Sequence, residues 1–144
     1  MPPRFWSGGV ITSTVANYNM MSRGQYNLAK DYLNESSVEV KKIRDGLGQG
    51  MAEVGAEKKD MVVLVADTME SSRAHFFGQK FPERTIQVGV AEQNLAGIAA
   101  GLAYDGKVPY VVTYAAFLLG RPWEPIRTMI AYPENHVIFV SSHA

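Results

Sequence analysis

The sequence contains no cysteine, no excess of either charge and no long apolar run. The absence of cysteine excludes disulfides, thiol catalysis and cysteine-ligated zinc. Its 14 basic residues balance its 14 acidic ones, so no strong field is available to attract nucleic acid or an anionic membrane. No apolar run approaches the ~20 residues that span a bilayer, and the N-terminal segment does not resemble a signal peptide. We therefore expect a cytoplasmic protein with no nucleic-acid or membrane partner.

Common catalytic signatures are missing as well. The sequence has no glycine-rich dinucleotide loop, no Walker loop and no nucleophile elbow, so the usual nucleotide-binding and hydrolase classes lose support. The three histidines are too scattered to form a metal motif by spacing, and we expect no metal ligand in the chain. What remains is a chain of 144 residues, long enough for one ordinary domain.

The composition divides the chain at about residue 36. Residues 1–36 are irregular and rich in Ser, Thr and Asn, and we interpret them as an N-terminal extension, either ordered only against a partner or derived from a leader. From Ser37 onward the pattern predicts a domain over 37–144, which opens with a helix whose apolar residues recur at spacings of three and four. These apolar residues are Val40, Ile43, Leu47, Met51 and Val54. Three glycines in this helix, at 46, 48 and 50, are compatible with close packing or with close approach of a ligand.

Strands and helices are expected to alternate along the rest of the chain. The expected strands are 61–66, 85–88, 108–114 and 137–140, and the expected helices are 73–80, 91–104 and 117–132, the last with its regular part starting near Pro122 and Pro125. The apolar, β-rich run MVVLVA at 61–66 is typical of a strand buried on both faces. The alternation predicts an α/β fold with a parallel sheet and helices on both faces. Ligands bind such sheets beyond the C-terminal ends of the strands.

Several side chains near these strand ends are candidates for chemistry, and each also has a plain structural interpretation. Glu92 begins a helix at the ligand edge, although a glutamate there also favours the helix dipole. Tyr114 and Phe117 are able to stack on a flat ring, or else belong to the core. His143 suits a sugar hydroxyl, or is simply an exposed terminal histidine. Arg44 with Ser71 and Ser72 suits a phosphate, or is a solvated arginine beside ordinary loop serines.

The run FPERTIQVGVAEQNLAGIAAGLA at 81–103 resembles the pyrimidine-binding domain of transketolases. The segment VPYVVTYAAFLLGRPWEPIRTMIAY extends the resemblance, and RDGLGQGMAEVG, VVLVADTMESS and the final SSHA are similar to its opening helix, its first strand and the start of its next motif. The likeness covers about residues 40–144. It implies the thiamine-diphosphate-binding, pyrimidine-domain fold, which we expect to be incomplete at the C-terminus.

The resemblance also implies a thiamine diphosphate site and a role for each matching residue. Glu92 matches the glutamate that shares a proton with N1′ of the aminopyrimidine ring, and burial in apolar surroundings would favour its protonated form. Tyr114 and Phe117 match ring-stacking positions, and Asp67 falls at the strand-end aspartate near the cofactor. Arg44 and Ser71 match contacts to the substrate's phosphate, and His143 matches a contact to the sugar's hydroxyls. Arg121 and Arg127 match arginines of the family and receive no substrate role.

By this resemblance the chain is a component of a transketolase that transfers two-carbon ketol units between sugar phosphates. The diphosphate and its Mg²⁺ or Ca²⁺ would be held mainly by a separate diphosphate-binding subunit, and we expect a homodimer or higher oligomer that is inactive as an isolated chain. One departure is Gly46-Leu47-Gly48, where the family has a bulkier Ala-aromatic-Gly. Two alternatives remain: a component similar to 1-deoxyxylulose-5-phosphate synthase, or a non-catalytic remnant that dimerises or regulates a complete enzyme.

Overall fold

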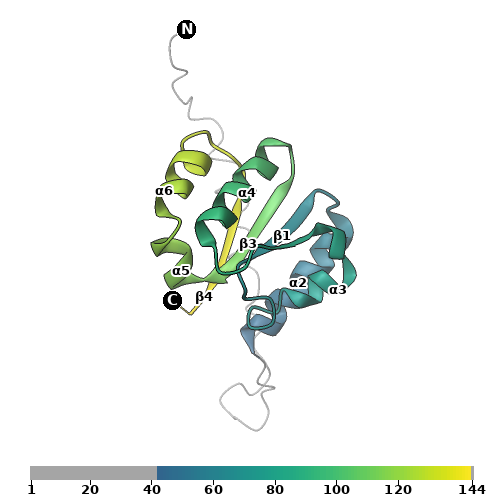
Figure 1. Cartoon of the computed structure of the whole chain (residues 1–144). Coiled ribbons are helices and arrows are strands. Elements are labelled where there is room, and N and C mark those ends of the chain that lie inside the picture. Colours follow the sequence, from purple (N-terminus) through teal and green to yellow (C-terminus); the bar gives the residue numbers. More distant parts are fainter. Residues whose placement is uncertain (1–41, 144) are drawn as a thin grey trace, which may run out of the picture. The chain divides into compact units, whose positions relative to one another are not determined.

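Four parallel strands form one sheet in the order β2-β1-β3-β4 (Figure 1). They are β1 (Met61–Val65), β2 (Thr85–Gln87), β3 (Val108–Tyr114) and β4 (Ile138–Ser142). The computed structural model describes residues 42–143, so the expected extension over 1–36 and the expected domain start at Ser37 lie outside the described residues. The strands occupy the apolar runs that predicted them, and the parallel α/β fold is confirmed.

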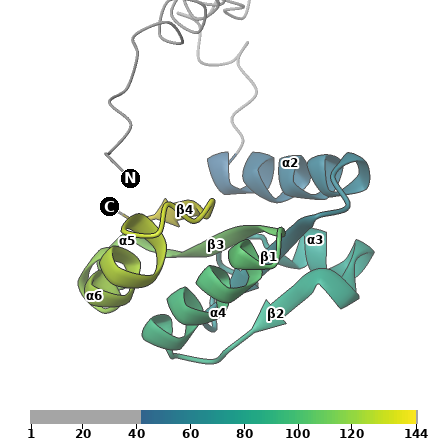
Figure 2. The same ribbon diagram turned by 90° about the horizontal axis from the view of Figure 1, so that it is seen from above.

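Helices cover both faces of this sheet (Figure 2). The helical elements are α2 (Ile43–Glu57), α3 (His75–Lys80), η2 (Pro82–Arg84), α4 (Glu92–Tyr104), α5 (Ala115–Gly120), α6 (Trp123–Pro125) and η3 (Ile126–Ala131). Alternate residues of β1 point to opposite faces. Met61, Val63 and Val65 pack against α2 and α3, whereas Val62 and Leu64 pack against α4 and α5. Among the described helices, none has the length and apolarity needed to cross a membrane.

The chain adds β2 on one side of β1 and adds β3 and β4 on the other, so the order of strands along the sheet reverses at the β1–β3 pair. The chain leaves β1 towards α3 on one face and leaves β3 towards α5 on the other face. A crevice forms at such a reversal beyond the C-terminal ends of the strands. Here the buried hydroxyl of Thr68, in the loop after β1, donates a 3.1 Å hydrogen bond to the carbonyl of Val112 in β3. That bond ties the loop to the neighbouring strand, and it positions the residues that follow β1.

The buried face of α2 differs from the expected apolar stripe. Ile43 was expected inside but is 93% exposed, whereas Met51 is buried as expected. The other buried positions of α2 are small: Gly48, Ala52 and Gly55. Leu47 packs against the core as expected, Val54 is exposed, and Val40 lies outside the described residues. Periodicity of large apolar residues does not register glycine, so it identified only part of the buried face.

Two glycines explain how closely α2 packs. A Cβ built on Gly48 would lie 2.6 Å from the carbonyl oxygen of Arg73, and one on Gly55 would collide with the ring of Phe77. Close packing, one of the two predicted reasons for the glycines, therefore holds for Gly48. The other two glycines singled out in the sequence are Gly46 and Gly50. A Cβ built on either of them would meet nothing within 4 Å.

The segment after β3 also differs from expectation. A helix was predicted over 117–132 with its regular part near Pro122, but α5 already begins at Ala115, directly after the strand. The N–H of Arg121 bonds to the carbonyl of Phe117 at 3.1 Å, and Pro122 then has no N–H with which to continue the series. The chain restarts as α6 and η3. Phe117 consequently lies within α5, one turn before Arg121.

Candidate functional site

Glu92 lies at the first position of α4, immediately after the loop that follows β2. Gly89 in that loop has φ +71°, a conformation that favours glycine, and it turns the chain from the strand towards the helix. The side chain of Glu92 is only 2% exposed. A carboxylate this buried needs a partner, because its charge has lost most of its hydration.

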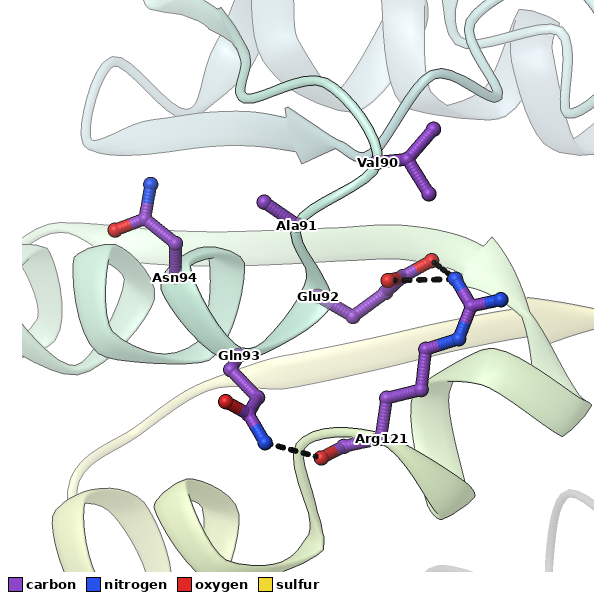
Figure 3. Close-up of a pocket in the computed structure, with 6 residues that line it drawn as sticks. All are labelled: Val90, Ala91, Glu92, Gln93, Asn94 and Arg121. Atoms are coloured by element: carbon purple, nitrogen blue, oxygen red, sulfur yellow. Dashed lines mark hydrogen bonds and ion pairs between the residues drawn. The ribbon is translucent and has the colours of Figure 1, made fainter.

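That partner is Arg121. Its Nη1 donates to both carboxylate oxygens of Glu92, at 2.8 Å and 2.9 Å, as Figure 3 shows. The side chain of Arg121 is 45% exposed, so the pair joins a buried anion to a cation that reaches in from the surface. The amide of Gln93 donates to the backbone carbonyl of Arg121 at 3.1 Å and ties the end of α5 to α4. We expected apolar surroundings for Glu92, and the structure corrects this expectation, because its carboxylate bonds to the guanidinium of Arg121.

Arg121 also reaches the predicted aromatic residues. Its guanidinium carbon lies 4.0 Å from the centroid of the Phe117 ring. The Phe117 ring is 5.7 Å from that of Tyr114, and the Tyr114 ring is 4.4 Å from that of His143. Four of the residues predicted from the sequence thus form one series of neighbours, with Arg121 as the link between Glu92 at the start of α4 and the three rings at the ends of β3 and β4.

Arg44 and Ser71 form a second group. Arg44 lies in the first turn of α2, and its Nη1 donates to the backbone carbonyl of Ser71 at 3.4 Å. The hydroxyl of Ser71 donates to the carbonyl of Thr68 at 3.2 Å. The structure therefore brings together Arg44 and Ser71, whereas the third phosphate candidate, Ser72, is buried and donates its hydroxyl to the carbonyl of Thr68 at 2.6 Å. Asp67 is exposed with φ +57°, and within residues 42–143 no hydrogen bond or ring contact joins it to either group.

Arg121 is the residue that sequence reasoning passed over. It stands four residues after Phe117, a spacing that places two side chains on the same side of a helix. That spacing was a usable signal once α5 was known to begin before Phe117. The contact with Glu92 had no such signal, because 29 residues separate the two in the chain.

A pocket of about 560 Å³ lies over this pair, which is within the usual range for small-molecule sites. It is lined by Val90, Ala91, Glu92, Gln93, Asn94 and Arg121. In Figure 3, Asn94 points away from the Glu92–Arg121 pair.

A flat, hydrogen-bonding cation already lies between the Glu92 carboxylate and the face of Phe117. The two groups therefore suit a planar ring with polar nitrogens, such as the aminopyrimidine that the resemblance implies. Residues 42–143 contain no cluster of three or more His, Asp or Glu side chains placed to hold a metal ion.

Comparisons with known proteins show what the chain is similar to. The family model described as the transketolase pyrimidine-binding domain matches residues 39–144. A protein of Methanocaldococcus jannaschii, provisionally named as a transketolase C-terminal section, is 43% identical over 104 residues, which cover 72% of this chain and 33% of that protein. A 6-deoxy-6-sulfo-D-fructose transketolase subunit of a Clostridium strain is 42% identical over 88 residues, covering 60% of this chain and 27% of the relative.

A solved structure is similar as well. It is described as a split-gene transketolase in an inactive β4 tetramer, and it matches with a TM-score of 0.63 and 43% identity. The match covers 69% of this chain and 33% of the other. The chain therefore spans a third or less of the length of these relatives.

Proposed function

The chain belongs to the family of transketolase pyrimidine-binding domains, and from this premise we propose that it supplies the aminopyrimidine wall of a transketolase-type thiamine diphosphate site. When bound, thiamine diphosphate provides the carbanion chemistry by which such enzymes transfer a two-carbon unit from a ketose to an aldose. The residues of this chain bind and orient the ring and handle its proton.

The observation that carries the proposal is the burial of Glu92 beside an aromatic face. Its side chain is 2% exposed, and its carboxylate is linked to Phe117 through a single arginine side chain. In the proposed site, Glu92 holds a proton at N1′ of the ring, a transfer that suits a carboxyl group shielded from water. Phe117, with Tyr114 beside it, supports the ring from one face, and Asp67 lies at the neighbouring strand end as a further cofactor contact.

The substrate side of the proposal rests on two further groups. Arg44 and Ser71 are adjacent, and a guanidinium with a nearby hydroxyl suits an anionic oxygen of the sugar substrate. His143 lies 4.4 Å from the ring of Tyr114, and we assign it to the sugar's hydroxyls. One relative is named for a sulfo sugar. A terminal anionic group on the ketose, a phosphate in our proposal, is therefore the substrate feature that we assign to Arg44 and Ser71.

A second polypeptide completes the site in this proposal. The described residues contain no metal-binding cluster, so we assign the diphosphate and its Mg²⁺ to a diphosphate-binding subunit. Two observations on relatives support a divided enzyme: one is named as a C-terminal section, and the other was solved as an inactive tetramer of a split-gene transketolase. We expect this chain to form a homodimer or higher oligomer that acts together with that subunit. The isolated chain should be inactive.

The test is reconstitution of ketol transfer. The chain is mixed with the diphosphate-binding subunit, thiamine diphosphate and Mg²⁺, and transfer from a ketose phosphate to an aldose phosphate is followed. Glu92→Gln should lower the rate by roughly 10²-fold or more, because it removes a positioned proton-transfer group. Glu57→Gln, the same change at an exposed position of α2, should leave the rate unchanged.

Each contrary outcome has a distinct meaning. Full activity of the Glu92→Gln protein contradicts the role of Glu92. Use of pyruvate in place of a ketose as donor supports the alternative of a 1-deoxyxylulose-5-phosphate synthase component. Absence of cofactor binding, with and without the partner, supports the alternative of a non-catalytic remnant.

A further inference from the structure

The side chain of Arg121 occupies both of the features that the proposed site offers to a ring. Its Nη1 lies 2.8 Å and 2.9 Å from the two oxygens of Glu92, and its guanidinium lies 4.0 Å from the centroid of Phe117. The guanidinium is flat, cationic and rich in N–H donors. These properties let it satisfy an acidic oxygen at its edge and an aromatic ring at its face.

We propose that Arg121 holds the place of the aminopyrimidine ring in the free chain and must leave it before the ring binds. The inference rests on the proposed function, because it takes Glu92 and Phe117 as the ring's partners. A ring in contact with the same face of Phe117 needs the separation of ~4 Å that the guanidinium already fills. The two groups therefore exclude one another, and cofactor loading is an exchange of partners at Glu92.

Burial explains why a placeholder is needed. With its side chain 2% exposed, Glu92 would carry an uncompensated buried charge in a chain that lacked both arginine and cofactor. Arg121 compensates that charge until another partner arrives. Among the described residues, the other hydrogen bond that joins α4 to the end of α5 runs from Gln93 to the Arg121 backbone and leaves the carboxylate untouched.

The geometry also shows how Arg121 is able to leave. Its side chain is 45% exposed, and both of its bonds to Glu92 come from one nitrogen rather than from the two-nitrogen fork of the strongest arginine–carboxylate pairs. Gln93 holds the backbone carbonyl of Arg121, so the backbone stays in place while the side chain turns outward. Release thus requires a change of side-chain rotamer and no movement of α4 or α5.

The test measures binding of the free aminopyrimidine moiety of thiamine to the full chain by NMR titration. If the open arrangement of Arg121 is populated about a tenth of the time, then Arg121→Gln should tighten binding about tenfold by removing the competitor. Arg127→Gln is the matched control, since Arg127 is an exposed arginine of η3, and it should bind as the wild type does. Arg121→Lys keeps a charge for Glu92 but loses the flat group that covers Phe117, and it should bind with intermediate affinity.

A second readout needs no ligand. Arg121→Gln should lower the thermal unfolding midpoint of the free chain because it leaves Glu92 unpaired, and adding Glu92→Gln should restore part of the loss. If Arg121→Gln does not fold, Arg121→Lys and the double variant Arg121→Gln with Glu92→Gln still report the effect of removing the Arg121 guanidinium. Equal or weaker ring binding by these variants, in conditions where the wild type binds, overturns the inference and leaves the proposed function standing. No binding by the wild type or any variant, with and without the diphosphate-binding subunit, contradicts the proposed function and the inference with it.

Discussion

The glycine face of α2 provides a sharp test of how the Arg44–Ser71 group is positioned. A methyl group added at Gly48 would lie 2.6 Å from the carbonyl oxygen of Arg73 and 2.7 Å from the ring of Phe76. The carbonyl is backbone, and Arg73 has φ +65°, so this loop has little freedom to yield. Overpacking of this kind lowers the free energy of unfolding by about 1–3 kcal/mol, and the higher helix propensity of alanine raises it by about 1 kcal/mol.

Gly48→Ala should therefore lower the free energy of unfolding by up to about 2 kcal/mol, the difference between those two contributions. Gly50→Ala lies in the same helix with nothing within 4 Å of the added carbon, and it should raise the free energy by up to about 1 kcal/mol. Urea unfolding of the two variants and the wild type, compared at equal m-value, measures both changes. Because the displaced loop carries Ser71, Gly48→Ala should also raise KM for the anionic substrate in the reconstituted enzyme.

Equal stability of the two alanine variants would refute this account of α2. A rise in stability for Gly48→Ala would do so more strongly, because it would mean that the helix does not rest on Arg73. If Gly48→Ala is destabilised while KM is unchanged, the packing argument stands and the substrate role of the loop is contradicted.

Two further predictions concern ion pairs and caps. A 2.6 Å hydrogen bond from Arg73 lowers the pKa of Asp45 below its ordinary value of 3.8. The resulting stabilisation is present above pH 3.8 and is lost as pH falls through the lowered pKa, so urea midpoints of wild type and Asp45→Asn should differ at pH 6 and converge in strong acid. Arg84 donates at 2.9 Å to the carbonyls of Gly55 and Lys58 and thereby caps the C-terminal end of α2. Arg84→Met should cost roughly 2–4 kcal/mol in the same unfolding assay and Arg84→Lys less, whereas a loss below ~1 kcal/mol would contradict the capping role.

The sheet could be predicted closely because its strands are marked by continuous apolar runs. Strand β3 begins and ends where the sequence predicted, at Val108 and Tyr114. The helices were less predictable, because their boundaries and buried faces depend on groups that periodicity does not weigh. Glycine makes the contact face of α2, and Pro122 separates α5 from α6.

The candidate site shows the same division. Residues at or just after strand ends, such as Tyr114 and His143, were expected at one edge of the sheet, and the structure places their rings 4.4 Å apart. The partner of Glu92 was not predictable from local pattern, because Arg121 reaches it across the fold from the end of another helix. A pairing of this kind depends on how α4 and α5 pack on the sheet, which requires the tertiary structure.

Glu92 and Phe117 receive the aminopyrimidine ring of thiamine diphosphate in the proposed site. The most direct measurement is an experimental structure of the chain assembled with its diphosphate-binding subunit, thiamine diphosphate and Mg²⁺. In that structure we expect the carboxylate of Glu92 within hydrogen-bond distance of N1′, the ring against Phe117, and the side chain of Arg121 turned outward. A bound cofactor whose ring lies elsewhere, with Glu92 still paired to Arg121, would contradict it.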